Sequence, residues 1–236
     1  MSQKWAVLIA ALCCPVLSAQ RLSDLALPTP LPPGSTLVIG FLGGFEHWND
    51  QHRSVRQLTL NLRNRPGVYA ESISNRHRAV ALDLIRRALD TNQDGNLDAE
   101  ERARARVILF GQSWGGAAAV ATARDLDQLG VPVLLAVQVD SVGLHDRVIP
   151  QNVFAAANFY QHDPLTIHGR SEIRAADPAR TRILGNTSST HTGVSVGEAN
   201  ASWARRTFGG SHARMEMDQK IWSKVERHIV DAIARR

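Results

Sequence analysis

Residues 106–121 of the 236-residue chain read RVILFGQSWGGAAAVA, and this stretch decides the fold. An apolar, β-branched run ends at Phe110, and a run of small residues begins at Gly115. Together they predict a strand, a sharp turn and a helix, with Ser113 at the turn and its hydroxyl at the edge of the sheet. Glycine is needed at Gly111 and Gly115 because the strand and helix backbones approach too closely there for side chains.

The pattern Gly-x-Ser-x-Gly at 111–115 resembles the nucleophile elbow of the α/β-hydrolase superfamily, in its lipase, esterase and thioesterase-like branches. The bare motif arises by chance in roughly one chain of this length in ten, so the strand before it and the helix after it carry the specificity. As an order of elements, the resemblance covers most of the chain after residue 35. It implies a three-layer α/β-hydrolase fold with a mostly parallel central sheet.

Residues 1–19 have the pattern of a cleavable secretory signal peptide, with a basic residue, an apolar core and a small-residue cleavage site. The sequence thus predicts a secreted or periplasmic protein with a single domain over residues 20–236. The signal segment is too short for a stable membrane span. Both cysteines, Cys13 and Cys14, lie within it, so the rest of the chain depends on a hydrophobic core without disulfides.

The charge balance argues against a nucleic-acid partner. The formal net charge is only +5 at pH 7, and the arginines are scattered instead of forming a basic stripe with interleaved aromatic residues. We expect the partner to be a small-molecule or lipid ester substrate and expect no organic cofactor. The sequence does not predict an oligomeric state.

Strand-like and helix-like patterns alternate along the chain, which predicts a parallel sheet with right-handed crossovers. Ligands of such sheets bind at the carboxyl ends of the strands, where Ser113 is expected. The segment 54–62 fits a helix, although its alternating leucines also fit a strand. Strands are predicted at 36–41, 67–73, 106–110, 131–139, 153–160 and 181–184, and helices at 54–62, 76–89, 115–129 and 217–233.

A serine nucleophile needs a base, and the base needs an orienting acid. The resemblance implies the chain order serine, acid, histidine, and it places the histidine in a loop between the last strand and the last helix. His212 fits that place, and His191 is the alternative. For the acid, Asp140 ends the strand 131–139 at the edge where the serine is expected. Asp163 follows the next strand, which the superfamily uses more often, and is the alternative.

An oxyanion hole needs two backbone N–H groups directed at the developing negative charge. The resemblance implies that one belongs to Trp114, the residue after the nucleophile. The second is expected in the glycine-rich loop after the first strand, from Phe45 or Gly44. Gly43 and Gly44 allow that backbone to come close to the serine.

Residues 90–101 read DTNQDGNLDAEE and match the calcium-binding loop of an EF-hand at every ligand position. Such a pattern arises by chance on the order of once per thousand chains of this length. Gly95 permits the sharp turn, and a lone loop of this kind favours a structural role for the ion over a regulatory one. The expected calcium ligands are Asp90, Asn92, Asp94, Asn96, Asp98 and Glu101.

The sequence therefore predicts an exported serine hydrolase that cleaves carboxylic ester or thioester bonds with Ser113, His212 and Asp140. An acyltransferase on the same scaffold is an alternative, because another alcohol can take the place of water. A calcium-dependent binding module without catalytic activity is the alternative from a different class. Covalent labelling by a fluorophosphonate separates enzyme from module, and product analysis with an added alcohol separates hydrolase from transferase.

Overall fold

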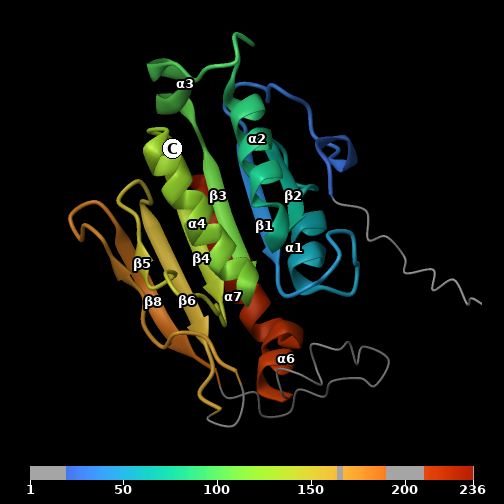
Figure 1. The fold of residues 1–236 in the computed structure, drawn as a ribbon, viewed down its shortest axis with the longest axis vertical. Helices are drawn as coiled ribbons and strands as arrows, with labels where there is room; N and C mark the ends of the chain where they lie inside the picture. The colour runs from blue at the N-terminus through green and yellow to red at the C-terminus, as the bar shows by residue number, and fades with distance from the viewer. Residues whose placement is uncertain (1–19, 164–166, 190–209, 236) are drawn as a thin grey trace, which may run out of the picture.

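The computed structural model describes residues 20–163, 167–189 and 210–235, so the predictions on residues 1–19 and on His191 lie outside the described residues. Six strands form a central sheet in the order β2-β1-β3-β4-β6-β8 (Figure 1). All neighbouring strands of this sheet pair in parallel. The sequence predicted a mostly parallel sheet. The strands are β1 (Thr36–Leu42), β2 (Val68–Ser74), β3 (Val107–Gln112), β4 (Val133–Val139), β6 (Ala155–Tyr160) and β8 (Arg182–Ser188).

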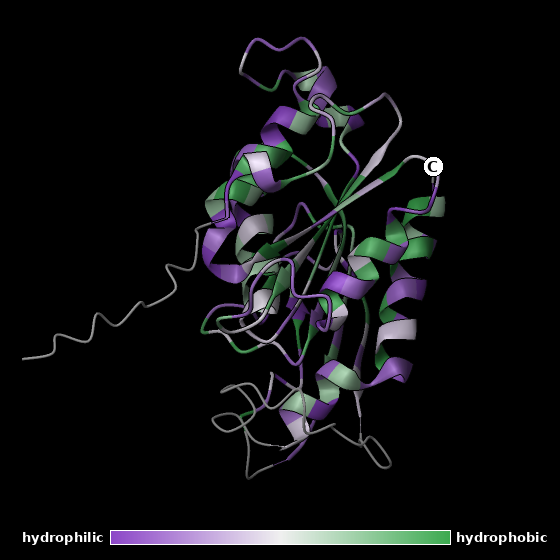
Figure 2. Ribbon diagram, turned by 90° about the vertical axis from the view of Figure 1, so that its right-hand side faces the viewer, coloured by the Kyte–Doolittle hydropathy of each residue, from purple (hydrophilic) through white to green (hydrophobic). Residues whose placement is uncertain are grey.

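Helices cover both faces of this sheet, which makes the predicted three-layer α/β architecture (Figures 1 and 2). Side chains of β1 alternate between the layers: Leu37 and Ile39 pack against α2 and α4, whereas Val38 packs against α1 and α7. The helices are α1 (Ser54–Leu62), α2 (Arg78–Leu89), α3 (Ala99–Arg104), α4 (Trp114–Gln128), α6 (Gly210–Met217) and α7 (Gln219–Ala234), with 3-10 turns η1 (Leu22–Asp24) and η2 (Asn75–His77).

The register of the central strands brings two predicted site residues together. Gln112 at the end of β3 pairs with Val139 at the end of β4. The next residue on each strand continues the ladder: the amide of Ser113 donates to the carbonyl of Val139 at 2.9 Å, and the amide of Asp140 donates to that of Phe159 at 2.7 Å. Ser113 and Asp140 therefore leave adjacent strands side by side at the carboxyl edge of the sheet.

The segment 54–62, which fits either a helix or a strand in the sequence, is helix α1. Its buried residues include Val55, Leu58 and Leu62, which recur at helical spacing and face the sheet. Two short strands, β5 (Val148–Ile149) and β7 (Arg174–Ala175), pair in parallel and were not predicted.

The closing helix predicted at 217–233 is confirmed as α7, which begins at Gln219, and the helix before it, α6, was not predicted. Asp218 separates them, and its carboxylate accepts a hydrogen bond from the amide of Lys220, which is an N-cap for α7. Among the described residues, no helix combines the length and the apolar character needed to cross a membrane.

The core of the sheet supplies the stability on which the site depends. Leu109 on β3 is completely buried, whereas Leu144 is 86% exposed. We expect Leu109→Ala to lower the free energy of unfolding by about 2–5 kcal/mol, because the lost methyl groups leave a cavity. Leu144→Ala is the matched control and should change it by less than about 0.5 kcal/mol. Urea denaturation of both variants measures the difference, and equal effects would contradict the placement of β3 at the centre of the core.

Candidate active site

Ser113 lies in a strained turn between β3 and α4. Its backbone has φ 55° and ψ −127°, a left-handed conformation that a residue with a side chain rarely adopts. The turn is held by its own hydrogen bonds, because the Ser113 carbonyl accepts from the amides of Gly116 at 3.0 Å and Val142 at 3.2 Å. The side chain is thereby fixed at the edge of the sheet, and the residue is 8% exposed.

Close backbone contacts require glycine on either side of Ser113, at Gly111 and Gly115, as the sequence predicted. A Cβ atom on Gly111 would lie 2.3 Å from the carbonyl oxygen of Gly115. A Cβ atom on Gly115 would lie 2.0 Å from the carbonyl oxygen of Phe41 on the neighbouring strand β1. Both contacts are with backbone atoms that cannot move aside, so the close approach of α4 to β3 and β1 requires glycine. This expectation is confirmed.

Asp140 and His212 form a buried hydrogen bond beside this turn. The Nδ1 atom of His212 lies 2.7 Å from Oδ2 of Asp140, and the two residues are 6% and 0% exposed. The other carboxylate oxygen of Asp140 accepts from the amide of Gly169 at 2.6 Å, and Gln161 Nε2 lies 3.3 Å from Oδ2. A buried carboxylate whose two oxygens are both engaged has a fixed orientation, and it fixes the ring of His212 in turn.

The prediction that His212 lies in a loop is wrong, because His212 belongs to the first turn of α6. The residues that follow it, including Ala213, Met215 and Glu216, favour helix, which explains why α6 forms there. The alternative acid, Asp163, accepts a hydrogen bond at 2.6 Å from the hydroxyl of Ser211, the residue before His212. Asp140 is thus the carboxylate that contacts the His212 ring, and Asp163 contacts the start of its helix.

Sequence reasoning missed Gln112, the residue before Ser113. Its side chain is buried, and its Nε2 atom lies 3.3 Å from Nε2 of His212. Its Oε1 atom would be 2.5 Å from a Cβ atom on Gly43, so the amide extends from His212 to the loop after β1. The Nε2 atom of His212 therefore contacts the side chain of the residue directly before Ser113. The signal available in the sequence was only that a long polar side chain directly precedes the serine.

The loop after β1 lies against the elbow, as the predicted oxyanion hole requires. A Cβ atom on Gly43 would be 3.0 Å from Cβ of Ser113, so this backbone passes directly beside the serine. Asn75 fixes the loop by donating to the carbonyls of Leu42 at 3.0 Å and Gly44 at 2.6 Å. Gly44 has φ 47°, a conformation that favours glycine.

The two residues predicted as oxyanion-hole donors are in contact through their rings. Phe45 and Trp114 have ring centroids 5.6 Å apart and nearly perpendicular planes. Phe45 is 47% exposed, and the guanidinium of Arg76 lies 5.0 Å from its ring centroid. The structure therefore brings both residues to the carboxyl edge of the sheet beside Ser113.

A cavity of about 580 Å³ opens next to the elbow at the ends of β4 and β6. Its walls combine apolar and polar groups, which suits a ligand with a small apolar body and one or more polar atoms. The lining includes Trp114, Ser141, Val142, Tyr160, His168 and Arg170.

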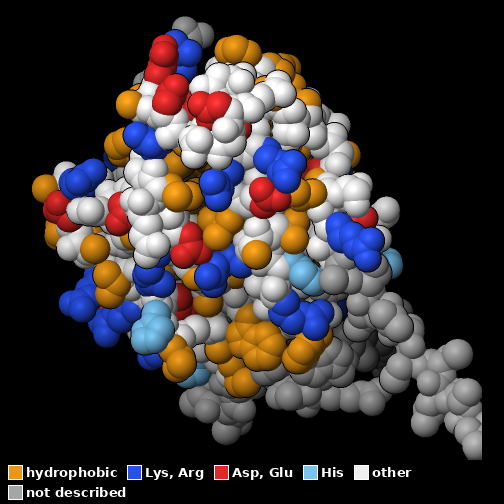
Figure 3. Space-filling view, turned by 45° about the horizontal axis from the view of Figure 1, so that its top comes forward, with side chains coloured by type: hydrophobic (Ala, Val, Ile, Leu, Met, Phe, Trp, Pro, Cys, Tyr) orange, Lys and Arg blue, Asp and Glu red, His pale blue; other side chains and the backbone are white. Residues whose placement is uncertain are grey.

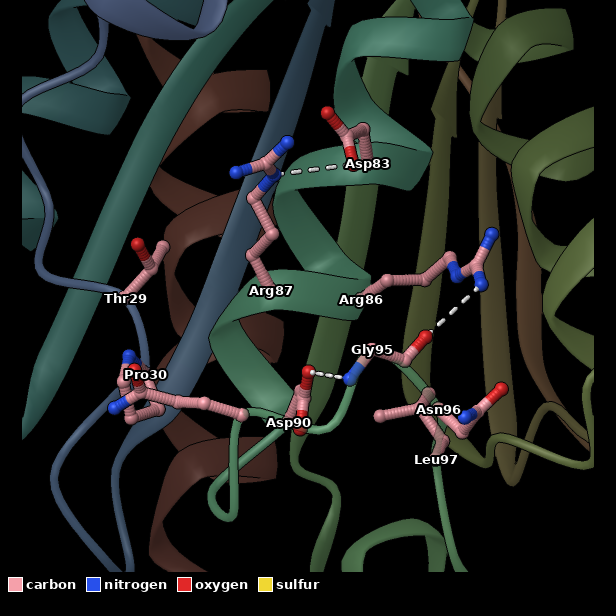
Figure 4. A pocket seen from close by; sticks show the side chains of 10 residues that line it. Thr29, Pro30, Asp83, Arg86, Arg87, Asp90, Gly95, Asn96 and Leu97 are labelled. Carbon is pink, nitrogen blue, oxygen red and sulfur yellow. Dashed lines mark hydrogen bonds and ion pairs between the residues drawn. The ribbon is translucent and has the colours of Figure 1, made fainter.

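The predicted calcium loop connects α2 to α3 at the end of the molecule opposite α6 (Figure 1). In Figure 3 the molecule is tilted so that this end comes forward, and acidic, basic and apolar side chains are intermixed on the visible face. Below the loop, a cavity of about 460 Å³ is lined by residues that include Asp83, Arg86, Arg87 and Asp90 (Figure 4). Arg87 pairs with Asp83 at 3.2 Å, and Asp90 accepts from the amide of Gly95 at 2.9 Å.

The oxygen atoms of the loop are turned toward its own backbone. Glu101 accepts at Oε1 from the amides of Thr91 and Asn92 and at Oε2 from the amide of Asp98, and these bonds, led by that from Asp98, hold its pKa below the usual value. In the described ranges, no three Asp, Glu, His or Cys residues are arranged to hold a metal ion. The donor types and spacing fit calcium, but binding would require Glu101 to exchange its backbone hydrogen bonds for contacts with the ion.

Comparisons with known proteins add one similarity of fold. No family model matches the chain, and no curated protein matches it. Among solved structures, it is similar to a dienelactone hydrolase-like promiscuous phosphotriesterase from metagenomic libraries, with 14% sequence identity and a TM-score of 0.40 over 85% of this chain and 88% of that one. A likeness of this size does not bear on the chemistry of the chain. The class that its own fold defines is a three-layer α/β domain with a parallel central sheet.

Gly169 gives a test of how Asp140 is held. A Cβ atom there would lie 2.6 Å from the carbonyl carbon of Asp140 and 2.7 Å from the amide nitrogen of Ser141. We expect Gly169→Ala to displace Asp140 and to lower the melting temperature by several degrees, as a loss of about 1–3 kcal/mol would. Gly210→Ala is the control, because a Cβ atom there has no neighbour closer than 3.6 Å. Thermal melting that gives equal stability for the two variants would contradict the close contact.

Proposed function

We propose that this chain is a serine hydrolase that cleaves carboxylic ester or thioester bonds. The observation that carries the proposal is the buried hydrogen bond between Asp140 and His212 beside the strained turn at Ser113. A nucleophile, a base and an acid that orients the base are the three groups that acyl transfer requires. The glycine-rich loop beside Ser113 adds backbone that can serve as an oxyanion hole.

Each residue has a defined role in the proposed reaction. The Ser113 hydroxyl attacks the acyl carbon while His212 Nε2 accepts its proton, and Asp140 stabilises the imidazolium that forms. The amides of Trp114 and Phe45 stabilise the negative oxygen of the tetrahedral intermediate. His212 then returns the proton to the leaving alcohol or thiol. His212 next accepts a proton from a water molecule, which attacks the acyl carbon of the acyl-enzyme. The proton returns to the Ser113 oxygen as the carboxylic acid is released.

The substrate class follows from the cavity beside Trp114. Its volume of about 580 Å³ lies within the usual range for small-molecule sites, and its mixed lining suits an ester with a short acyl or alcohol part. We also propose, from the pattern of residues 1–19, that the protein is exported. Sequencing the N-terminus of the protein recovered from outside the cytoplasm tests that proposal.

Steady-state hydrolysis of p-nitrophenyl acetate by variants tests the assigned roles. Ser113→Ala and His212→Ala should each lower kcat by about 10⁴–10⁶-fold, because the covalent route is lost. Asp140→Asn should cost about 10⁴-fold, since the amide no longer holds the correct tautomer of the base. Asp163→Asn is the matched control, and its effect should be mild. A larger loss in Asp163→Asn than in Asp140→Asn would move the role of the acid to Asp163, and substantial activity in Ser113→Ala would rule out the mechanism.

We propose separately that the loop at 90–101 binds calcium in a structural role. The support is the spacing of its oxygen donors and the four carboxylates, which repel one another when no cation is present. Binding to the folded state alone adds about 1.4 kcal/mol of stability at roughly ten times the Kd, so millimolar calcium should raise the melting temperature. Glu101→Gln should remove most of that rise. Coincident melting curves with calcium and with a chelator would show that the loop is only a hydrogen-bonded turn.

A further inference from the structure

A partly buried group of charged side chains lies between the loop after β1 and helix α6. Arg53, the residue before α1, is at its centre: its Nη1 atom lies 3.1 Å from Oε1 of Glu46 and 2.9 Å from Oε2 of Glu216. Its Nε atom lies 3.2 Å from Oδ2 of Asp50. The side chains of Arg53, Glu46 and Glu216 are 12%, 9% and 9% exposed. We call these four residues the Arg53 cluster.

The two glutamates connect this cluster to different parts of the candidate site. Glu46 uses its second oxygen, Oε2, to accept from the amide of Gly43 at 3.2 Å, and Gly43 is the residue whose backbone lies against Ser113. Glu216 follows His212 by four residues in α6, so both side chains lie on the same side of that helix. The cluster therefore joins the backbone beside the nucleophile to the helix that carries the base.

The backbone around Glu216 is also held in place. Its carbonyl oxygen accepts from the hydroxyl of Ser54 at 2.5 Å and from the indole N–H of Trp222 at 2.7 Å. Ser54 is adjacent to Arg53, so the start of α1 contacts α6 through both a side chain and a backbone group. The second half of α6 is thus fixed, and the orientation of its first turn, with His212, depends on how Glu216 is held.

The single guanidinium of Arg53 pairs with the carboxylates of Glu46, Asp50 and Glu216. Burial and then the neighbouring Glu216 raise the pKa of Glu46 well above its usual value, and burial raises that of Glu216 while Arg53 opposes the change. Each carboxylate is favourable in its place only while it contacts the guanidinium. Moving the loop or the helix away from Arg53 would leave a buried charge without its partner, so the two elements are held at a fixed separation.

We propose, on the basis of the proposed hydrolase function, that Arg53 is a positioning residue that holds the loop carrying the oxyanion-hole amide and the helix carrying His212 in register with each other. Arg53 contacts neither Ser113 nor His212 in its hydrogen bonds and ion pairs, and it acts through Glu46 and Glu216. Its loss shifts both the Gly43–Phe45 backbone and the ring of His212. No residue of the Arg53 cluster lines the binding cavity, so we expect its shape to change little.

The test compares three variants of the full chain by p-nitrophenyl acetate kinetics and thermal melting. Arg53→Met should lower kcat by about 100-fold with little change in KM, as a small misplacement of catalytic groups does. The triple variant Arg53→Met/Glu46→Gln/Glu216→Gln removes the buried charges, and it should regain melting temperature but not kcat. Arg65→Met is the matched control, because Arg65 pairs with Glu226 at 3.1 Å on the surface, and both values should stay near those of the wild type.

An unchanged kcat in Arg53→Met, or a kcat that recovers together with melting temperature in the triple variant, would overturn the proposal and leave Arg53 a purely structural residue. If Arg53→Met does not fold, the folded triple variant decides by its kcat alone.

If the wild type hydrolyses no ester, the proposed function fails, and the downfield proton NMR signal of the hydrogen bond between His212 and Asp140 becomes the readout. That signal should shift or broaden in Arg53→Met and stay unchanged in Arg65→Met, and no change in Arg53→Met would refute the positioning role.

Discussion

The left-handed turn at Ser113 is the constraint on which the rest of the structure depends. A residue with a side chain adopts φ 55° only when its surroundings leave no alternative. Here the surroundings are backbone atoms: Gly115 lies against the carbonyl of Phe41, and Gly111 lies against that of Gly115. Helix α4 can therefore pack onto β3 and β1 only in this position, and the buried small residues along α4 continue the close contact. Strain at the serine is offset by packing through the length of the helix.

Burial of charge at the carboxyl edge imposes the second requirement. Asp140 is completely buried, and a carboxylate in that position is tolerable only when its oxygens accept hydrogen bonds. Gly169, Gln161 and His212 provide them from three separate segments. Glu46 and Glu216 are also buried carboxylates that need a partner, and the guanidinium of Arg53 provides it. His212 is thus held from both sides, by Asp140 on its ring and by Glu216 through its helix.

Much of this arrangement was predictable because its causes are local. The apolar run before Ser113 and the glycines around it specify strand, turn and helix within a few residues, and the position of Asp140 at the end of β4 follows from strand alternation. The contact of Gln112 with His212 and that of Arg53 with Glu216 could not be predicted, because each joins residues 100 or more positions apart. The helical placement of His212 was missed because the loop was inferred only from the resemblance, whereas the residues after His212 favour a helix that continues to Met217.

In the proposed function, Ser113 is a nucleophile made reactive by the pair of His212 and Asp140. The most direct measurement is peptide mass spectrometry after incubation with diisopropyl fluorophosphate, which forms a stable phosphoryl adduct with an activated serine and with few others. We expect one adduct per chain, on the peptide that contains Ser113. An adduct on a different residue, or a chain that stays unmodified after prolonged incubation, would contradict it.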